Sequence, residues 1–171
     1  MEISLLTPKC TLVPADFIDR GACREILGEV AIVSDEDEVI CKDIPQFHAV
    51  LIYAFGSDST RIVNEEIISD EDSPQSEMYF ILRDLNKCPD YNKILCTWAE
   101  GHLYMAIAQG RTLLLANTYA SPDFTTAQYF IFMAMKSLQL NPEVSTIYWR
   151  HPISKDSEMS LYHYFKSVDN L

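Results

Sequence analysis

The sequence predicts an α/β fold with mixed sheets, in two lobes that cover residues 1–88 and 89–171. Residues 48–55, HAVLIYAF, form a near-continuous apolar run, which is typical of a strand buried on both faces. Residues 92–149 contain three short apolar runs joined by glycine-containing links, then a helical pattern, then a fourth apolar run. At 171 residues and 48% hydrophobic content, the chain can bury the core that such an arrangement needs.

The first lobe is expected to contain a strand, a helix, a hairpin, a second strand and two further helices. Pro14 suits the first turn of the first helix, and Gly21 is placed to break it. The tip of the hairpin is the charged stretch SDED, residues 34–37. In chain order the elements are the strand CTLV (10–13), the helix PADFIDRGACREIL (14–27), the hairpin strands EVAIV (29–33) and EVICKDI (38–44), the strand at 48–55, and the helices SDSTRIVNEEII (57–68) and SPQSEMYFILRDLN (73–86).

The second lobe is expected to run strand, strand, strand, helix, strand, helix. Two-residue links at Glu100–Gly101 and Gln109–Gly110 favour an antiparallel meander, because such links need positive backbone angles. Ser121 and Pro122 start the helix, Asn141–Pro142 ends it, and the strand that follows should lie parallel in the same sheet. The elements are the strands KILCTW (93–98), HLYMAIA (102–108), TLLLANT (112–118) and VSTIYW (144–149), and a closing helix SEMSLYHYFKSV (157–168). A ribonuclease-H-like lobe, the unit that occurs twice in actin-like ATPases, begins in this order.

Several stretches of the chain carry a family resemblance. They are TLVPADF (11–17), HAVLIYAF (48–55), GRTLLLANTYASPDFTTAQYFIFMAMKSLQLNPE (110–143) and LYHYF (161–165). In these stretches the chain resembles DUF3822, an uncharacterised bacterial family whose members have an actin-like ATPase fold. The resemblance implies that fold but no catalytic residue. Family members are usually longer at the N-terminus, so the first lobe is expected to be N-terminally incomplete, without its two leading strands.

The charge balance narrows the classes of partner. With 13 Lys and Arg against 25 Asp and Glu, the formal net charge is −12, which disfavours nucleic acid and anionic membrane surfaces. The longest apolar run, Tyr129–Met135, is too short to span a bilayer, and the N-terminus has no signal-peptide pattern. A cytoplasmic protein without membrane insertion is therefore expected. The five cysteines form no metal-binding or disulfide pattern and are expected to be reduced, mostly buried thiols.

The hairpin at WAEGHLYM (98–105) is the natural place to look for a nucleotide site. An actin-like phosphate hairpin needs an aspartate near the end of its first strand, then glycine or small hydroxyl residues whose amides can approach the anion. Here Glu100 and Gly101 form the tip, followed by His102 and the bulky Leu103. The sequence therefore predicts a hairpin with the strands and turn of an actin-like phosphate hairpin but without the residues that bind phosphate. No catalytic residue and no cofactor are predicted, and binding of ATP and magnesium is the less favoured alternative.

Other polar stretches are candidate sites. The stretch FGSDST (55–60) follows a buried strand, so Gly56, Ser57, Ser59 and Thr60 are candidates to hold an anionic cofactor, although helix capping is the preferred interpretation. The stretch SDED occurs at 34–37 and again at 69–72. Both copies are expected to be solvated loops, because neither has the glycine and terminal glutamate of a calcium loop. No metal site is predicted.

The helix AQYFIFMAMKSL (127–138) is apolar on all sides. Such a helix is either enclosed between layers, the preferred interpretation, or covered by a partner. Trp149, Tyr162 and Tyr164 are the candidate anchors of a partner interface.

The leading hypothesis is a non-catalytic scaffold or adaptor that binds another protein or a second copy of itself. The alternative is a nucleotide-binding ATPase or kinase with part of its site in N-terminal residues absent from this chain. Metal-dependent phosphodiester chemistry ranks last, because the strand KILCTW (93–98) carries no carboxylate.

Overall fold

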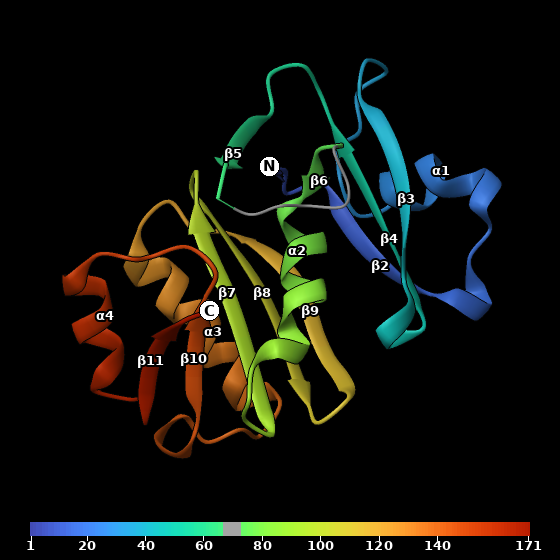
Figure 1. Ribbon diagram of the computed structural model, residues 1–171. Helices are drawn as coiled ribbons and strands as arrows, with labels where there is room; N and C mark the ends of the chain where they lie inside the picture. The colour runs from blue at the N-terminus through green and yellow to red at the C-terminus, as the bar shows by residue number, and fades with distance from the viewer. Residues whose placement is uncertain (67–72) are drawn as a thin grey trace. The chain divides into compact units, whose positions relative to one another are not determined.

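The computed structural model describes residues 1–66 and 73–171, and the chain divides into two units, residues 1–80 and 81–171 (Figure 1). The division falls inside helix α2 (Glu77–Asp84), earlier in the chain than the boundary at residue 88 that the sequence suggested. Each unit is described by itself below.

Two three-stranded sheets make up the described part of unit 1. In the first, β1 (Glu2–Leu6) lies between β5 (Thr60–Asn64), to which it is antiparallel, and β6 (Gln75–Ser76), to which it is parallel. In the second, β4 (Ala49–Phe55) lies between its antiparallel neighbours β2 (Cys10–Pro14) and β3 (Glu38–Ile44). The prediction of a central strand at 48–55 is confirmed, since residues 49–54 of β4 are all buried.

The predicted hairpin at 29–44 is wrong in its first strand. Val30 N and Ala31 N both donate to Leu27 O, at 3.1 and 2.9 Å, so the chain folds back on the end of α1 (Cys23–Gly28) instead of pairing with β3. The predicted helix at 14–27 is shorter than expected. It consists of two 3₁₀ turns, Ala15–Phe17 and Arg20–Ala22, followed by α1, and the Asp19 carboxylate accepts from Gly21 N at the break.

Two further differences concern strands. The predicted helix at 57–68 is wrong, because Thr60–Asn64 is β5; residues 67 and 68 lie outside the described part of the chain. The β-branched residues Thr60, Ile62 and Val63 suit a strand, and this preference outweighs the capping residues before them. The strand β1 was not predicted, although Ile3, Leu5 and Leu6 have strand-forming side chains. The predicted helix at 73–86 is confirmed from Glu77 onward, as α2 and the 3₁₀ turn Leu85–Lys87, but its first part is wrong, because Gln75–Ser76 is β6.

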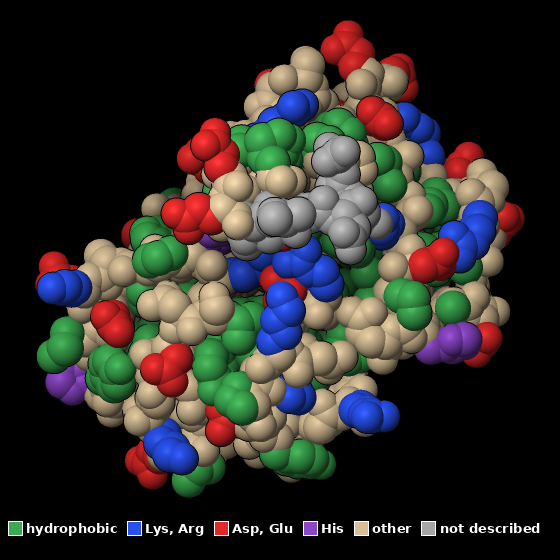
Figure 2. Space-filling view, in the orientation of Figure 1, with side chains coloured by type: hydrophobic (Ala, Val, Ile, Leu, Met, Phe, Trp, Pro, Cys, Tyr) green, Lys and Arg blue, Asp and Glu red, His purple; other side chains and the backbone are tan. Residues whose placement is uncertain are grey.

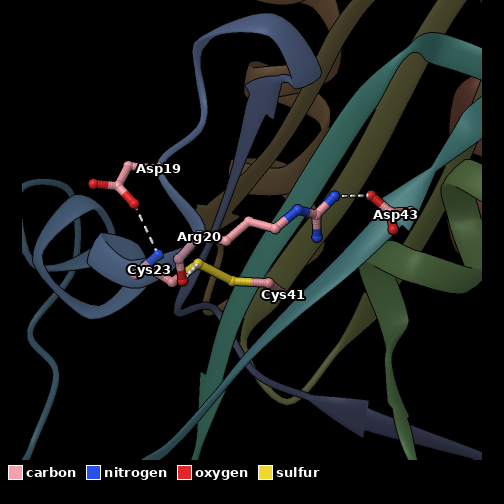
Figure 3. Close-up of a disulfide and its surroundings, with 6 residues drawn as sticks. Asp19, Arg20, Cys23, Cys41 and Asp43 are labelled. Atoms are coloured by element: carbon pink, nitrogen blue, oxygen red, sulfur yellow. Dashed lines mark hydrogen bonds and ion pairs between the residues drawn. A yellow bond between two sulfur atoms is a disulfide. The ribbon is translucent and has the colours of Figure 1, made fainter.

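A disulfide joins Cys23, at the start of α1, to Cys41 of β3, which corrects the expectation that all five cysteines are reduced (Figure 3). Beside it, Arg20 donates to Asp43, so the same segment is held to β3 by an exposed ion pair as well. The remaining cysteines, Cys10, Cys88 and Cys96, are free. Disulfides persist mainly in oxidising compartments, so this bond is evidence against the expected cytoplasmic location.

Unit 2, residues 81–171, is built on one five-stranded sheet with the order β11-β10-β7-β8-β9. The central strand β7 is antiparallel to β8 and parallel to β10, as predicted. The strand β11 was not predicted; it occupies the end of the predicted last helix and pairs in parallel with β10. The strands are β7 (Asn92–Ala99), β8 (His102–Gln109), β9 (Thr112–Ala120), β10 (Thr146–Trp149) and β11 (Ser167–Asn170), and the helices are α3 (Phe124–Ser137) and α4 (Lys155–Tyr162).

The two tight links of the meander follow the glycines. Glu100 and Gly101 have φ of 49° and 69°, so the first link is the two-residue turn that the sequence predicted. The second link is Gly110–Arg111, one residue later than predicted, because Gln109 pairs with Thr112. Gly110 takes the positive φ, 56°.

One face of the sheet carries the main core of unit 2, beneath α3 and α4 (Figure 1). The buried side of α3 consists of Ala127, Ile131, Ala134 and Met135. The opposite side is not enclosed, which corrects the preferred interpretation of this apolar helix. Tyr129 is 63% exposed and Met133 is 38% exposed. The helix is capped by Asp123, whose carboxylate accepts from Thr126 N, two residues later than the predicted start.

The net charge is divided unequally between the units. Residues 1–80 contain 5 Lys and Arg against 17 Asp and Glu, and residues 81–171 contain 8 against 8. The whole formal charge of −12 therefore belongs to unit 1, and unit 2 is neutral.

Reducing the Cys23–Cys41 bond is expected to lower the free energy of unfolding of unit 1 by about 3 kcal/mol, because the bond restricts the unfolded chain. Urea denaturation followed by circular dichroism, with and without dithiothreitol, measures this change. The matched control is the double variant Cys23→Ser/Cys41→Ser, in which dithiothreitol should have no effect. A wild-type midpoint that does not move in reductant would contradict the prediction.

Candidate functional site

The carboxyl ends of β7 and β10 lie side by side, since these strands are parallel and Trp149 pairs with Cys96. In open α/β sheets, ligands bind beyond the carboxyl ends of such strands. In unit 2 the aromatic rings near this edge belong to the core: Trp149 is fully buried, and Trp98 and Phe124 pack against the same core cluster. The Trp98 and Phe124 ring centroids are 5.3 Å apart, and those of Phe124 and Trp149 are 5.8 Å apart. These rings therefore contribute to core packing at this end of the strands.

The tip of the β7–β8 hairpin is bonded to the start of α3. Ser121 N donates to Gly101 O at 2.7 Å, and Trp98 Nε1 donates to Ser121 O at 2.9 Å. Acidic residues occupy both positions: Glu100 is at the turn, and Asp123 is the N-cap of α3, where its carboxylate accepts from Thr126 N at 2.8 Å. Because like charges repel, this arrangement opposes an anion.

The predicted interface anchors are not equivalent. Trp149 is fully buried, with 0% of its surface exposed, so it cannot contact a partner and the prediction is wrong for this residue. Tyr162 and Tyr164 are 45% and 54% exposed and are accessible. Tyr162 also donates its hydroxyl to Val168 O at 3.0 Å, which fixes its ring beside β11.

The candidate cofactor residues Gly56, Ser57, Ser59 and Thr60 lie in or beside the turn between β4 and β5, and no helix follows them. Gly56 N donates to Ser59 Oγ at 3.1 Å, and Ser59 N donates to Gly56 O at 3.2 Å, so the turn is closed by its own groups. A Cβ built on Gly56 would lie 2.8 Å from Asp58 Oδ1 and 3.1 Å from Asp37 Oδ1. Two carboxylates thus flank the turn, and it is poorly suited to an anionic cofactor.

The first SDED stretch is exposed at Ser34, Asp35 and Glu36, as predicted for a solvated loop, but not at Asp37. Asp37 is buried, pairs with Lys9 at 2.6 Å and accepts from Ser34 N at 2.8 Å. The hydrogen bond from Lys9, followed by the one from Ser34, holds the pKa of Asp37 below its ordinary value. The second SDED stretch, 69–72, lies outside the described residues. Among residues 1–66 and 73–171, no group of three or more His, Cys, Asp and Glu side chains is placed to hold a metal ion.

The free thiols of unit 2 are poor nucleophiles. Burial raises the pKa of Cys88 to about 12, and burial also raises the pKa of Cys96, which is fully buried. Since the thiolate is the reactive form, neither group is activated at neutral pH.

A buried ionic cluster in unit 2 was missed by the sequence analysis. The Asp84 carboxylate, at the end of α2, accepts from Arg83 Nε and Nη2 at 2.7 Å each, from Lys87 Nζ at 2.8 Å and from Arg150 Nη1 at 3.1 Å. The side chains of Asp84 and Arg150 are only 5% and 6% exposed. Figure 2 shows Lys and Arg side chains gathered over this end of α2.

The cluster holds α2 to the carboxyl end of β10. Arg150 directly follows this strand, and its backbone N donates to Cys96 O of β7 at 3.0 Å. Burial alone would raise the pKa of Asp84, but the hydrogen bonds and charges of Arg83 and Lys87 outweigh it, so the pKa lies below the ordinary value of 3.8. No sequence pattern marks this cluster, because Arg150 is 66 residues from Asp84.

A hollow lies on the outer side of α3 in unit 2. Its volume is about 350 Å³, and Tyr129, Phe132, Met133 and Lys136 line it. We call it the α3 hollow. The Phe132 ring also meets Tyr164 edge to face, with centroids 4.8 Å apart. The hollow therefore adjoins one of the two accessible tyrosines predicted as anchors.

Comparisons with known proteins agree with this description of the fold. The model of the family "Protein of unknown function (DUF3822)" matches residues 2–168, so the chain belongs to this family. A crystal structure from Bacteroides thetaiotaomicron VPI-5482, described as a protein with actin-like ATPase fold and unknown function, superposes with a TM-score of 0.73 at 11% identity. The match covers 97% of this chain and 66% of that one, which shows an actin-like fold. No curated protein matches the chain.

The length and apolar character of the helices bear on the expectation that the protein does not insert into a membrane. In the described part of the chain, no helix has both the length and the apolar character needed to cross a bilayer.

Asp84→Asn is expected to lower the free energy of unfolding of unit 2 by about 3–5 kcal/mol, because three cations would then surround a neutral amide. Urea denaturation followed by tryptophan fluorescence measures this, since both tryptophans, Trp98 and Trp149, lie in unit 2. The exposed turn carboxylate in Asp35→Asn is the control and should leave the midpoint unchanged.

The same variant has a pH signature. Because the pKa of folded Asp84 is depressed, its ionised form stabilises the fold above the unfolded-state pKa, about 3.9, and that stabilisation is lost as the pH falls through the lower folded-state value. The stability gap between wild type and Asp84→Asn should therefore narrow on acidification from pH 7. A gap that stays constant would rule out the assigned role of this carboxylate.

Proposed function

We propose that this protein is a non-catalytic scaffold or adaptor that works by binding another protein or a second copy of itself. One observation carries the proposal: near the carboxyl ends of β7 and β10, Trp98 and Phe124 pack against the core that contains the buried Trp149, so these rings belong to the interior of unit 2. The turn beside them has Glu100 at its tip, and the carboxylate of Asp123 caps the N-terminus of α3. An actin-like frame with this edge supports binding through its outer surfaces better than phosphate chemistry.

The surface chemistry favours a protein as the partner. Unit 1 has 17 acidic against 5 basic residues, so nucleic acid and anionic membranes would be repelled. Exposed aromatic side chains, such as Tyr129 and Tyr164, are enriched at protein interfaces. No cofactor is needed for this function.

A second candidate function is nucleotide binding, as in an ATPase or kinase. It is favoured by the fold and by the cations Arg83, Lys87 and Arg150 near the carboxyl end of β10. All of these cations already bond to Asp84, so binding phosphate would have to compete with a buried carboxylate. We rank this function second.

Titration calorimetry with magnesium-ATP and magnesium-ADP tests the choice between the two functions. The expected result is no saturable heat, because an acidic residue, Glu100, is at the hairpin tip and the Gly56 turn is closed by its own hydrogen bonds. Saturable micromolar binding that Arg150→Ala weakens would overturn the scaffold proposal and favour the second candidate. Exposed Arg111→Ala serves as the matched control for loss of an arginine.

We also propose a cytoplasmic location, against which the Cys23–Cys41 bond weighs. Alkylating thiols in intact cells before lysis distinguishes a cytoplasmic location from an oxidising compartment. Labelled Cys23 and Cys41 would support the cytoplasm, and an intact disulfide would support an oxidising compartment.

A further inference from the structure

The α3 hollow has the pattern of a helix-docking surface. Its lining residues Tyr129, Phe132, Met133 and Lys136 follow the spacing i, i+3, i+4, i+7, so they form one continuous stripe along a single helix. Helices pack by fitting the side-chain ridges of one into the grooves of another, and a stripe of this kind is what one helix contributes to such a contact. Tyr129 and Met133 are 63% and 38% exposed, so no second helix in the described part of the chain packs on this stripe.

We propose that the α3 hollow docks an acidic amphipathic helix of another protein. An apolar side chain of that helix enters the hollow between Tyr129, Phe132 and Met133, and a carboxylate about one turn away pairs with Lys136. This inference rests on the proposed scaffold function and names the surface and the class of partner.

The size and composition of the hollow suit inserted side chains. Its volume of about 350 Å³ is at the low end of the range of roughly 300–1,000 Å³ for pockets that enclose small ligands. Three of its four lining residues are apolar, and the two rings Phe132 and Tyr164 stand edge to face beside it. Hydrophobic grooves accept the apolar face of an amphipathic helix, and methionine is common at such adaptable binding surfaces.

The charge of the lining selects the partner. Lys136 is the one charged residue around the hollow, it is exposed, and it makes no ion pair with any described residue of the chain. A second copy that docked by the same surface would bring Lys136 against Lys136 and no lining carboxylate. A single lysine is also too little for an anionic membrane, which attracts clusters of basic residues. A partner helix with its own carboxylate is the occupant that the charge favours.

Selection from a display library of short helical peptides, with the full-length chain as bait, tests the proposal. The enriched peptides are then titrated by fluorescence anisotropy against the wild type, Met133→Glu and Lys136→Glu. Peptides with an apolar residue one turn from Asp or Glu are expected to dominate. Their affinity should fall about tenfold in each variant, since one variant blocks the hollow and the other reverses the pairing charge. Peptides remade with Lys in place of the acid should prefer Lys136→Glu.

The controls separate this inference from the proposed function. Ile32→Glu, a substitution at an 89% exposed residue of unit 1, should bind the peptides like the wild type. Thermal denaturation checks that each variant folds, which is expected because Met133 and Lys136 are exposed. Selected peptides that bind Met133→Glu as tightly as the wild type would overturn the α3 hollow as the docking surface while leaving the scaffold function standing.

Three other outcomes also decide against this occupant. Enriched peptides without an acidic residue would overturn the role of Lys136. No enrichment would overturn the docking inference, and together with saturable magnesium-ATP binding it would overturn the scaffold function too. Sedimentation with phosphatidylserine vesicles that Lys136→Glu abolishes would assign the surface to a membrane instead.

Discussion

Unit 2 depends on one buried carboxylate. Asp84 ends α2, and through Arg150 it is tied to the residue that directly follows β10. Removing two charges from water is costly, and the cost is offset only where both are well paired and hydrogen-bonded. Asp84 meets this condition because each of its oxygens accepts from two donors. The end of α2 is thus held to the central strands by an ion cluster as well as by apolar packing.

The regular parts of unit 2 followed from the sequence because local signals and tertiary packing agree there. Gly101 and Gly110 have the positive φ that tight links require, and the apolar runs between them became β7, β8 and β9. The failures occurred where local signals conflicted with long-range pairing. Residues 29–33 have strand-forming side chains, yet hydrogen bonds to Leu27 O close a turn and leave no partner strand for them. The start of β11 was predicted as helix because Phe165 and Val168 continue the apolar spacing of Leu161 beyond the end of α4.

For the candidate sites, too, the sequence predicted local features but not contacts between distant segments. The absence of an Asp-x-Gly pattern at the hairpin was readable from Glu100 and Gly101 alone. That Trp149 is buried while Tyr164 is half exposed was not readable, because both belong to aromatic stretches and only the sheet decides which face each residue takes. The Asp84 cluster and the Cys23–Cys41 bond depend on contacts between distant segments, which spacing along the chain does not reveal.

The unequal division of charge has a consequence for how copies of this protein meet in solution. Unit 2 presents exposed apolar side chains on a surface without net charge, and such a surface by itself would favour self-association. Unit 1 gives every copy the same large negative potential, so two molecules repel each other before their apolar surfaces touch. The acidic half therefore acts as a colloidal stabiliser for the neutral half. Salt at concentrations that shorten the Debye length to a few ångströms screens this repulsion, so the apolar surfaces of two copies can then associate.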